Sequence, residues 1–209
     1  MSTQFHMHKA RLETLVDGVF AIAMTILVLE VKVPEIADGR STDALLHALA
    51  HHGYVIGAYF FSFAMLALFW VWHHRLVEKI REFDFPLLVC TLVFLALVCF
   101  FPFAAALLGR YPLNLGALLV YVPLTGMIVL LQALLFALAV RRRLLVDSVS
   151  ADDVLATQRR NFRGCAIFFF ASIPTALRVH VAWIGVCVVL GVFFLWLARA
   201  RVKHTQKAA

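Results

Sequence analysis

The chain has 209 residues, 63% of them hydrophobic, and its mean hydropathy is +0.91. Soluble domains use roughly 45–50% apolar residues, so this composition excludes a soluble globular protein and predicts an integral membrane protein. The net charge of +7 does not indicate a nucleic-acid partner, because the basic residues flank long apolar segments, as membrane topology requires.

Six apolar segments approach the roughly 20 residues that a helix needs to cross a hydrocarbon core about 30 Å thick. In chain order they cover residues 12–33, 54–72, 85–107, 113–140, 162–177 and 181–198. No internal repeat or long linker divides them, so we predict one all-α domain of six transmembrane helices over residues 1–209. In the connection before the fifth segment, Ser150 and Asp153 form a variant of a helix-start box that predicts a short interfacial helix.

Basic residues are distributed unevenly between the two sides of this arrangement. Of the 19 lysines and arginines, all but Lys32, Arg40, Arg110 and Arg178 fall on the side that both termini share. Positive charge marks the cytoplasmic face, so we predict that both termini are cytoplasmic. The four cysteines lie in predicted spans without metal-ligand spacing, and we expect no metal and no cofactor.

The first apolar segment carries an acid, Asp17, near its beginning. At about 100° per residue, Asp17 lies on the helix face opposite Ile22. Acids inside membrane spans are rare and are usually paired or functional. The candidate partners, which share the cytoplasmic side, are Arg11, His73, His74 and Arg75. We predict a cluster that locks the inner ends of the first two helices together.

The face of the first segment around Ile22 forms a continuous stripe. Its members are Leu15, Gly18, Ile22, Thr25, Ile26, Leu29 and Val33. The stripe is compatible with a pore lining and also with simple packing, because small residues such as Gly18 and Thr25 let membrane helices approach closely. Spacing alone leaves both interpretations open.

The run RLETLVDGVFAIAMTILVLEV, residues 11–31, resembles the first-helix signature of the transmembrane protein 175 family, potassium channels of lysosomes and bacteria. Arg11 and Asp17 match the family pattern of Arg, three residues, then Phe-Ser-Asp. The runs FWVWHHRLVEKIREFD and FPFAAALLGRYP are similar to the second and third helices of the family. Leu15 and Val16 stand where the family has Phe and Ser, so the serine hydroxyl is missing here.

The resemblance implies a six-helix subunit of the prokaryotic, single-repeat form, a homotetramer in the inner membrane with first helices around a central pore. It implies a gate at Ile22, Ile26 and Leu29, and potassium preference at Thr25. A narrow apolar ring can gate by excluding water. Because no TVGYG filter occurs in the sequence, we expect only modest potassium selectivity over sodium. The expected partners are further copies of the chain, membrane lipid and permeant potassium ions.

Two other functions remain open from the sequence. Asp17 with His73 or His74 is suited to a proton relay in a proton-coupled secondary transporter, and a non-conducting membrane scaffold is a third interpretation. An enzyme is not expected, because the sequence contains no zinc-helix, nucleophile-elbow or phosphate-loop motif.

Overall fold

The computed structural model describes residues 9–112 and 114–176. These residues form six helices: α1 (Lys9–Leu29), α2 (Thr42–His51), α3 (Gly53–Val77), α4 (Phe85–Arg110), α5 (Leu115–Arg141) and α6 (Ala151–Ala176). The predicted sixth span, residues 181–198, lies outside the described residues, as does the last residue of the predicted fifth span.

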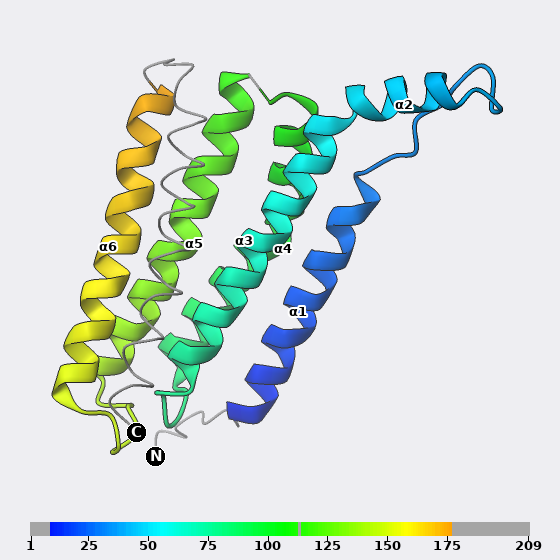
Figure 1. The fold of residues 1–209 in the computed structure, drawn as a ribbon. Coiled ribbons are helices and arrows are strands. Elements are labelled where there is room, and N and C mark those ends of the chain that lie inside the picture. Colours follow the sequence, from blue (N-terminus) through cyan, green and yellow to red (C-terminus); the bar gives the residue numbers. More distant parts are fainter. Residues whose placement is uncertain (1–8, 113, 177–209) are drawn as a thin grey trace, which may run out of the picture.

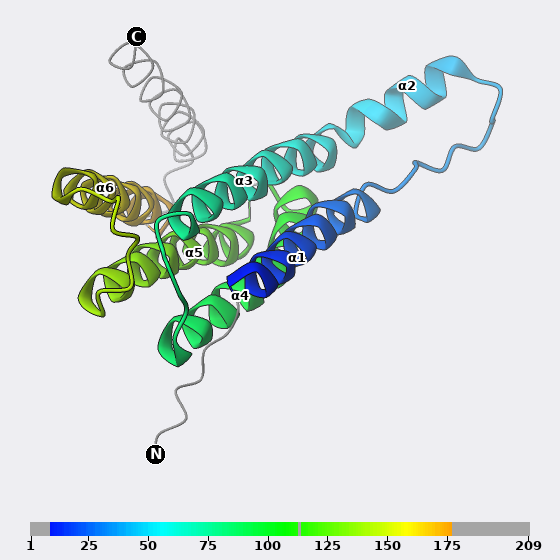
Figure 2. The same ribbon diagram turned by 90° about the horizontal axis from the view of Figure 1, so that it is seen from below.

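Five of the helices run side by side, and α2 lies apart from them beyond the beginning of α3 (Figure 1). α1 packs against α3 and α4, and α6 packs against α5. Seen from below, α1 and α6 lie on opposite sides of the bundle (Figure 2). The beginnings of α1, α4 and α6 and the ends of α3 and α5 therefore meet at one end of the molecule (Figure 1).

Four helices, α1, α3, α4 and α5, are long and apolar enough to cross a membrane. They coincide with the first four predicted spans, so the prediction of an all-helical membrane fold is confirmed for these four helices. Side chains cap the beginnings of two of them: the carboxylate of Asp84 accepts a hydrogen bond from the Leu87 amide at 3.1 Å, and Asn114 caps α5 through the Gly116 amide at 2.8 Å.

The predicted interfacial helix and the predicted fifth span form one helix, α6. The Ser150 hydroxyl accepts a hydrogen bond from the Asp153 amide at 3.1 Å, which confirms the helix-start box. The prediction of a separate short helix was wrong, because no breaker interrupts residues 151–176 before Pro174 and the hydrogen-bonded ladder continues.

One face of α1 supplies the packing core on that side of the bundle. Its buried residues are Leu12, Val16, Phe20, Ala23 and Leu27, which are three or four positions apart, as on one helix face. Phe20 packs against Phe94 of α4 with ring centroids 5.9 Å apart. This core fixes the rotation of α1, so it also fixes which side chains of α1 face away from the chain.

Candidate functional site

The predicted pore-facing stripe of α1 lies on its open side. Ile22 is 60% exposed, Ile26 40% and Leu29 72%, and Thr25 is exposed between them. The stripe is unused by the packing of the single chain, which buries the opposite face of α1. The structure therefore brings the four predicted gate and selectivity residues onto one free surface.

Thr25 is the one hydrogen-bonding side chain among these four. Its hydroxyl donates to the backbone carbonyl of Ile22 at 2.9 Å. A hydroxyl has one donor and two acceptor lone pairs, so a Thr25 oxygen whose proton is held by the helix retains acceptor capacity. That arrangement suits contact with a cation.

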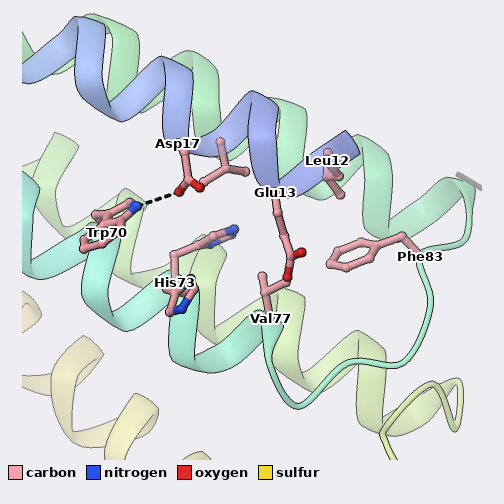
Figure 3. Close-up of a pocket in the computed structure, with 9 residues that line it drawn as sticks. Leu12, Glu13, Asp17, Trp70, His73, Val77 and Phe83 are labelled. Carbon is pink, nitrogen blue, oxygen red and sulfur yellow. Dashed lines mark hydrogen bonds between the residues drawn. The ribbon is translucent and has the colours of Figure 1, made fainter. Parts of the chain in front are cut away.

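Asp17 lies on the other side of α1 and faces α3, as its helical phase predicts. Its carboxylate accepts a hydrogen bond from the indole Nε1 of Trp70 at 2.8 Å (Figure 3). The Trp70 ring stacks on His74 with centroids 5.7 Å apart, and His74 Nε2 lies 3.4 Å from a Glu78 carboxylate oxygen. The first half of α1 and the second half of α3 are thus joined through an indole.

The hydrogen-bond partner of Asp17 is not among the residues predicted from the sequence. His73 and His74 line the same pocket as Asp17, but the hydrogen bond comes from Trp70. Arg11 is exposed and is not among the residues that line this pocket. Sequence reasoning missed Trp70 because it considered only charged and titratable partners, although Trp70 precedes His74 by one helical turn and so shares its face.

His73 occupies a different environment from His74. Its ring is 1% exposed and stacks on Phe94 with centroids 4.6 Å apart and an interplanar angle of 8°. Neither ring nitrogen has a hydrogen-bond partner in the structure. Within the described part of the chain, no hydrogen-bonded path therefore joins His73 to Asp17.

Val16, which stands where the resemblance has serine, is a core residue here. It is 5% exposed and packs in the cluster that contains Phe20 and Phe94. A hydroxyl at this position would need a partner inside an apolar cluster. The contacts of Asp17 therefore do not include a hydroxyl at position 16, and its hydrogen bond comes from Trp70.

The beginning of α1 is also tied to the rest of the chain. The Lys9 ammonium donates to the Ile80 carbonyl at 2.8 Å and lies 3.8 Å from a Glu13 carboxylate oxygen. Ile80 in turn pairs with Leu145 in an antiparallel bridge. This end of α1 is therefore held to the α3–α4 and α5–α6 connections.

Comparison with known proteins agrees with this architecture. The family described as endosomal/lysosomal potassium channel TMEM175 matches residues 11–102. A potassium channel of Chamaesiphon minutus is 31% identical over 188 residues, covering 88% of this chain and 92% of the relative. A potassium channel of Streptomyces collinus is 32% identical, covering 81% of this chain and 86% of the relative.

A solved structure extends the similarity to three dimensions. It is the crystal structure of a lysosomal potassium-selective channel TMEM175 homolog from Chamaesiphon minutus, with a TM-score of 0.75, 31% identity, and coverage of 90% of this chain and 96% of that one. The human endosomal/lysosomal proton channel TMEM175 is 39% identical over 79 residues, only 16% of its length.

The helical membrane fold with its open first-helix face is thus that of a channel family and not of an enzyme. More specifically, the chain belongs to the TMEM175 family.

Proposed function

We propose that the chain forms a potassium-permeable cation channel in a prokaryotic inner membrane, as a homotetramer in which α1 lines the pore. The observation that carries the proposal is the open stripe of α1, on which Ile22, Thr25, Ile26 and Leu29 all lie. The names of the bacterial relatives support potassium as the permeant ion.

Gating is assigned to the apolar members of the stripe. Rings of Ile22, Ile26 and Leu29 side chains around a narrow axis exclude the water that an ion carries, so the pore conducts only when the rings widen. Thr25 lies between Ile22 and Ile26, and its hydroxyl oxygen replaces part of the hydration shell. A single layer of hydroxyl oxygens gives modest potassium selectivity over sodium.

The orientation follows the basic residues. The connections that carry Lys79, Arg81 and residues 141–143 lie at the same end as the beginning of α1 (Figure 1). Positive charge marks the cytoplasmic side, so this end, with the amino terminus, is placed in the cytoplasm. The carboxyl terminus is assigned to the same side from the predicted sixth span.

A proton-coupled transporter is the second candidate, because Asp17, His73 and His74 line one pocket and because the mammalian relatives are named proton channels. A relay needs groups that exchange protons through hydrogen bonds. The Asp17 carboxylate accepts a hydrogen bond from an indole, which does not give up its proton, and His73 has no hydrogen-bond partner among the described residues. The geometry therefore favours the channel.

The test is the current through purified protein in planar bilayers under a potassium/sodium gradient. Ile22→Ala widens the narrowest apolar ring, so we expect a severalfold larger current than wild type at equal protein. Thr25→Ala removes the hydroxyl layer, so we expect the reversal potential to shift toward equal permeability for the two cations. Val28→Ala is the matched control, since Val28 is 49% exposed on α1 but lies off the stripe.

The two candidates give opposite results. A channel shows unitary currents that respond to Ile22→Ala and not to Val28→Ala. Wild type and Ile22→Ala that are both silent, while proton-coupled uptake into liposomes persists, would establish the transporter and assign the stripe to packing.

A further inference from the structure

A polar seam joins α3 to α6 near the end of the bundle where α1 begins. The indole Nε1 of Trp72 donates to the Asn161 side-chain oxygen at 3.2 Å, and the Lys79 ammonium donates to the Thr157 hydroxyl at 2.7 Å. Thr157 and Asn161 are each 3% exposed. They share one face of α6 with Arg160, because residues three and four positions apart are neighbours on a helix.

Hydrogen-bond donors exceed acceptors in this seam. The Arg160 guanidinium lies over the Trp72 ring, 5.9 Å from its centroid, and its buried Nε has no hydrogen-bond partner among the described residues. The buried amide nitrogen of Asn161 also has none. Nearly all buried polar groups in proteins are paired, so two buried donors on consecutive residues without partners among the described residues indicate a missing acceptor.

The seam also gathers positive charge. Burial lowers the pKa of Lys79, the charge of Arg160 lowers it further, and Asp153 raises it. Arg75 lies one turn before Lys79 and interacts electrostatically with Arg160. Among the described residues, no acid lies within ion-pair distance of Arg75, Lys79 or Arg160. Asp153 itself accepts a hydrogen bond from Ser150 at 2.8 Å.

We propose that Arg75, Lys79 and Arg160, with the side-chain amide of Asn161, bind a phosphate group at the junction of α3 and α6. A phosphate group supplies acceptor oxygens for the unpaired donors and negative charge for the three cations. Guanidinium groups bind phosphate oxygens with charge-assisted hydrogen bonds. The α3 side of the site lies at the last turn of a membrane-spanning helix, where a phospholipid headgroup or free phosphate can reach it.

The glycine at position 164 supports this arrangement. A Cβ atom there would lie 2.7 Å from Cη2 of Trp72, so only glycine lets the indole lie against α6 in its present position. In this position the face of the indole contacts the Arg160 guanidinium, and the indole nitrogen donates a hydrogen bond to Asn161. Trp72 is thus a positioning residue for the phosphate site.

The site is tested by thermal unfolding of the full chain in detergent, with three additives at equal ionic strength: dioctanoyl phosphatidylglycerol, dioctanoyl phosphatidylcholine and inorganic phosphate. A ligand that binds only the folded state raises the Tm. We expect the anionic lipid to raise the Tm of wild type and of Arg159→Gln, the exposed neighbour that loses the same charge. Loss of one charge-assisted contact weakens binding by about tenfold, so Arg160→Gln should need about tenfold more lipid.

The additives separate the two phosphate sources. A shift with phosphatidylglycerol alone identifies a lipid headgroup, and an equal shift with inorganic phosphate identifies the free anion. No shift with any of the three additives, or equal losses in Arg159→Gln and Arg160→Gln, overturns the proposal. An equal shift with the zwitterionic lipid, which also carries a phosphate, shows that the phosphate is recognised and not the net charge of the lipid. Lys79→Gln, outside the membrane-spanning helices, gives the same test where Arg160→Gln does not accumulate. The readout is binding, so it is independent of ion conduction.

Discussion

Asp17 shows how a membrane helix keeps a carboxylate. Its position on the face opposite Ile22 directs it to α3, and the indole of Trp70 supplies a hydrogen bond to it at 2.8 Å. Helical phase predicted the face, because the phase depends only on the spacing of residues. It did not predict the partner, because several side chains of α3 reach the same pocket and only packing selects among them.

Replacing Trp70 tests this pairing. Trp70→Phe keeps an aromatic ring beside His74 but removes the indole donor, so the Asp17 carboxylate loses its hydrogen bond. We expect the free energy of unfolding to fall by about 1 kcal/mol, a modest value because Asp17 is exposed in the single chain. The measurement is chemical unfolding in detergent micelles.

A double-mutant cycle supplies the control. If the bond carries the effect, Trp70→Phe should cost less in an Asp17→Asn background than in wild type, because the charged acceptor is already gone. Additive losses in the two variants would show that Trp70 acts through packing alone.

At the scale of helices, the sequence predicted that the four apolar spans exist but did not predict the residues at which they end. The predicted first span continues to residue 33, but α1 ends at Leu29. The amides of Glu30 and Val31 bond to carbonyls three residues back, at 3.4 and 3.0 Å, which tightens the last turn. Pro34 then disfavours helical geometry at the residue before it.

Two further helical features lie outside what apolar windows can show. α2 was not predicted, because it has only 10 residues, too few for a membrane span. It begins at a cap where the Ser41 hydroxyl accepts from the Ala44 amide at 3.2 Å. α6 packs on α5, and its polar first half reaches α3 through the hydrogen bond between Asn161 and Trp72. Hydropathy detects long apolar segments, and neither the length nor the apolarity of a segment predicts these contacts.

The contact of α6 with Trp72 can be tested through Gly164. In Gly164→Ala, the new methyl group lies within 2.7 Å of Trp72 Cη2 and 3.4 Å of Val129 Cγ1. Overpacking of this kind costs about 1–3 kcal/mol, so the variant should unfold at lower denaturant concentration. Gly57→Ala is the matched control: a methyl group there meets no atom within 4 Å, and a gain in helix propensity of up to about 1 kcal/mol is expected. Equal behaviour of the two alanine variants would show that Trp72 yields without cost.

At the scale of the whole chain, the end of the bundle assigned to the cytoplasm is held by its connections. The Arg81 amide donates to the Leu144 carbonyl at 2.8 Å, and the Val146 amide donates to the Lys79 carbonyl at 3.0 Å. Arg142 forms an ion pair with Asp84. These contacts join segments far apart in sequence, and nothing in the local pattern predicts them. The other end of α1 leads into the non-helical connection to α2. The contacts described above therefore fix α1 at its beginning.

The open stripe of α1 makes the last prediction one about assembly. If α1 surrounds a central axis, Leu29, which is 72% exposed on the stripe, lies near its counterpart in the adjacent subunit. In a background without the four native cysteines, Leu29→Cys should cross-link to a dimer with a short bis-maleimide in membranes. Light scattering of the detergent-solubilised protein should give four times the 23.5 kDa chain mass. Phe100→Cys on α4, 49% exposed, is the control for random encounter. Efficient cross-linking at Phe100 without cross-linking at Leu29, or a monomeric mass, would place the subunit contact elsewhere and leave the stripe of α1 to lipid.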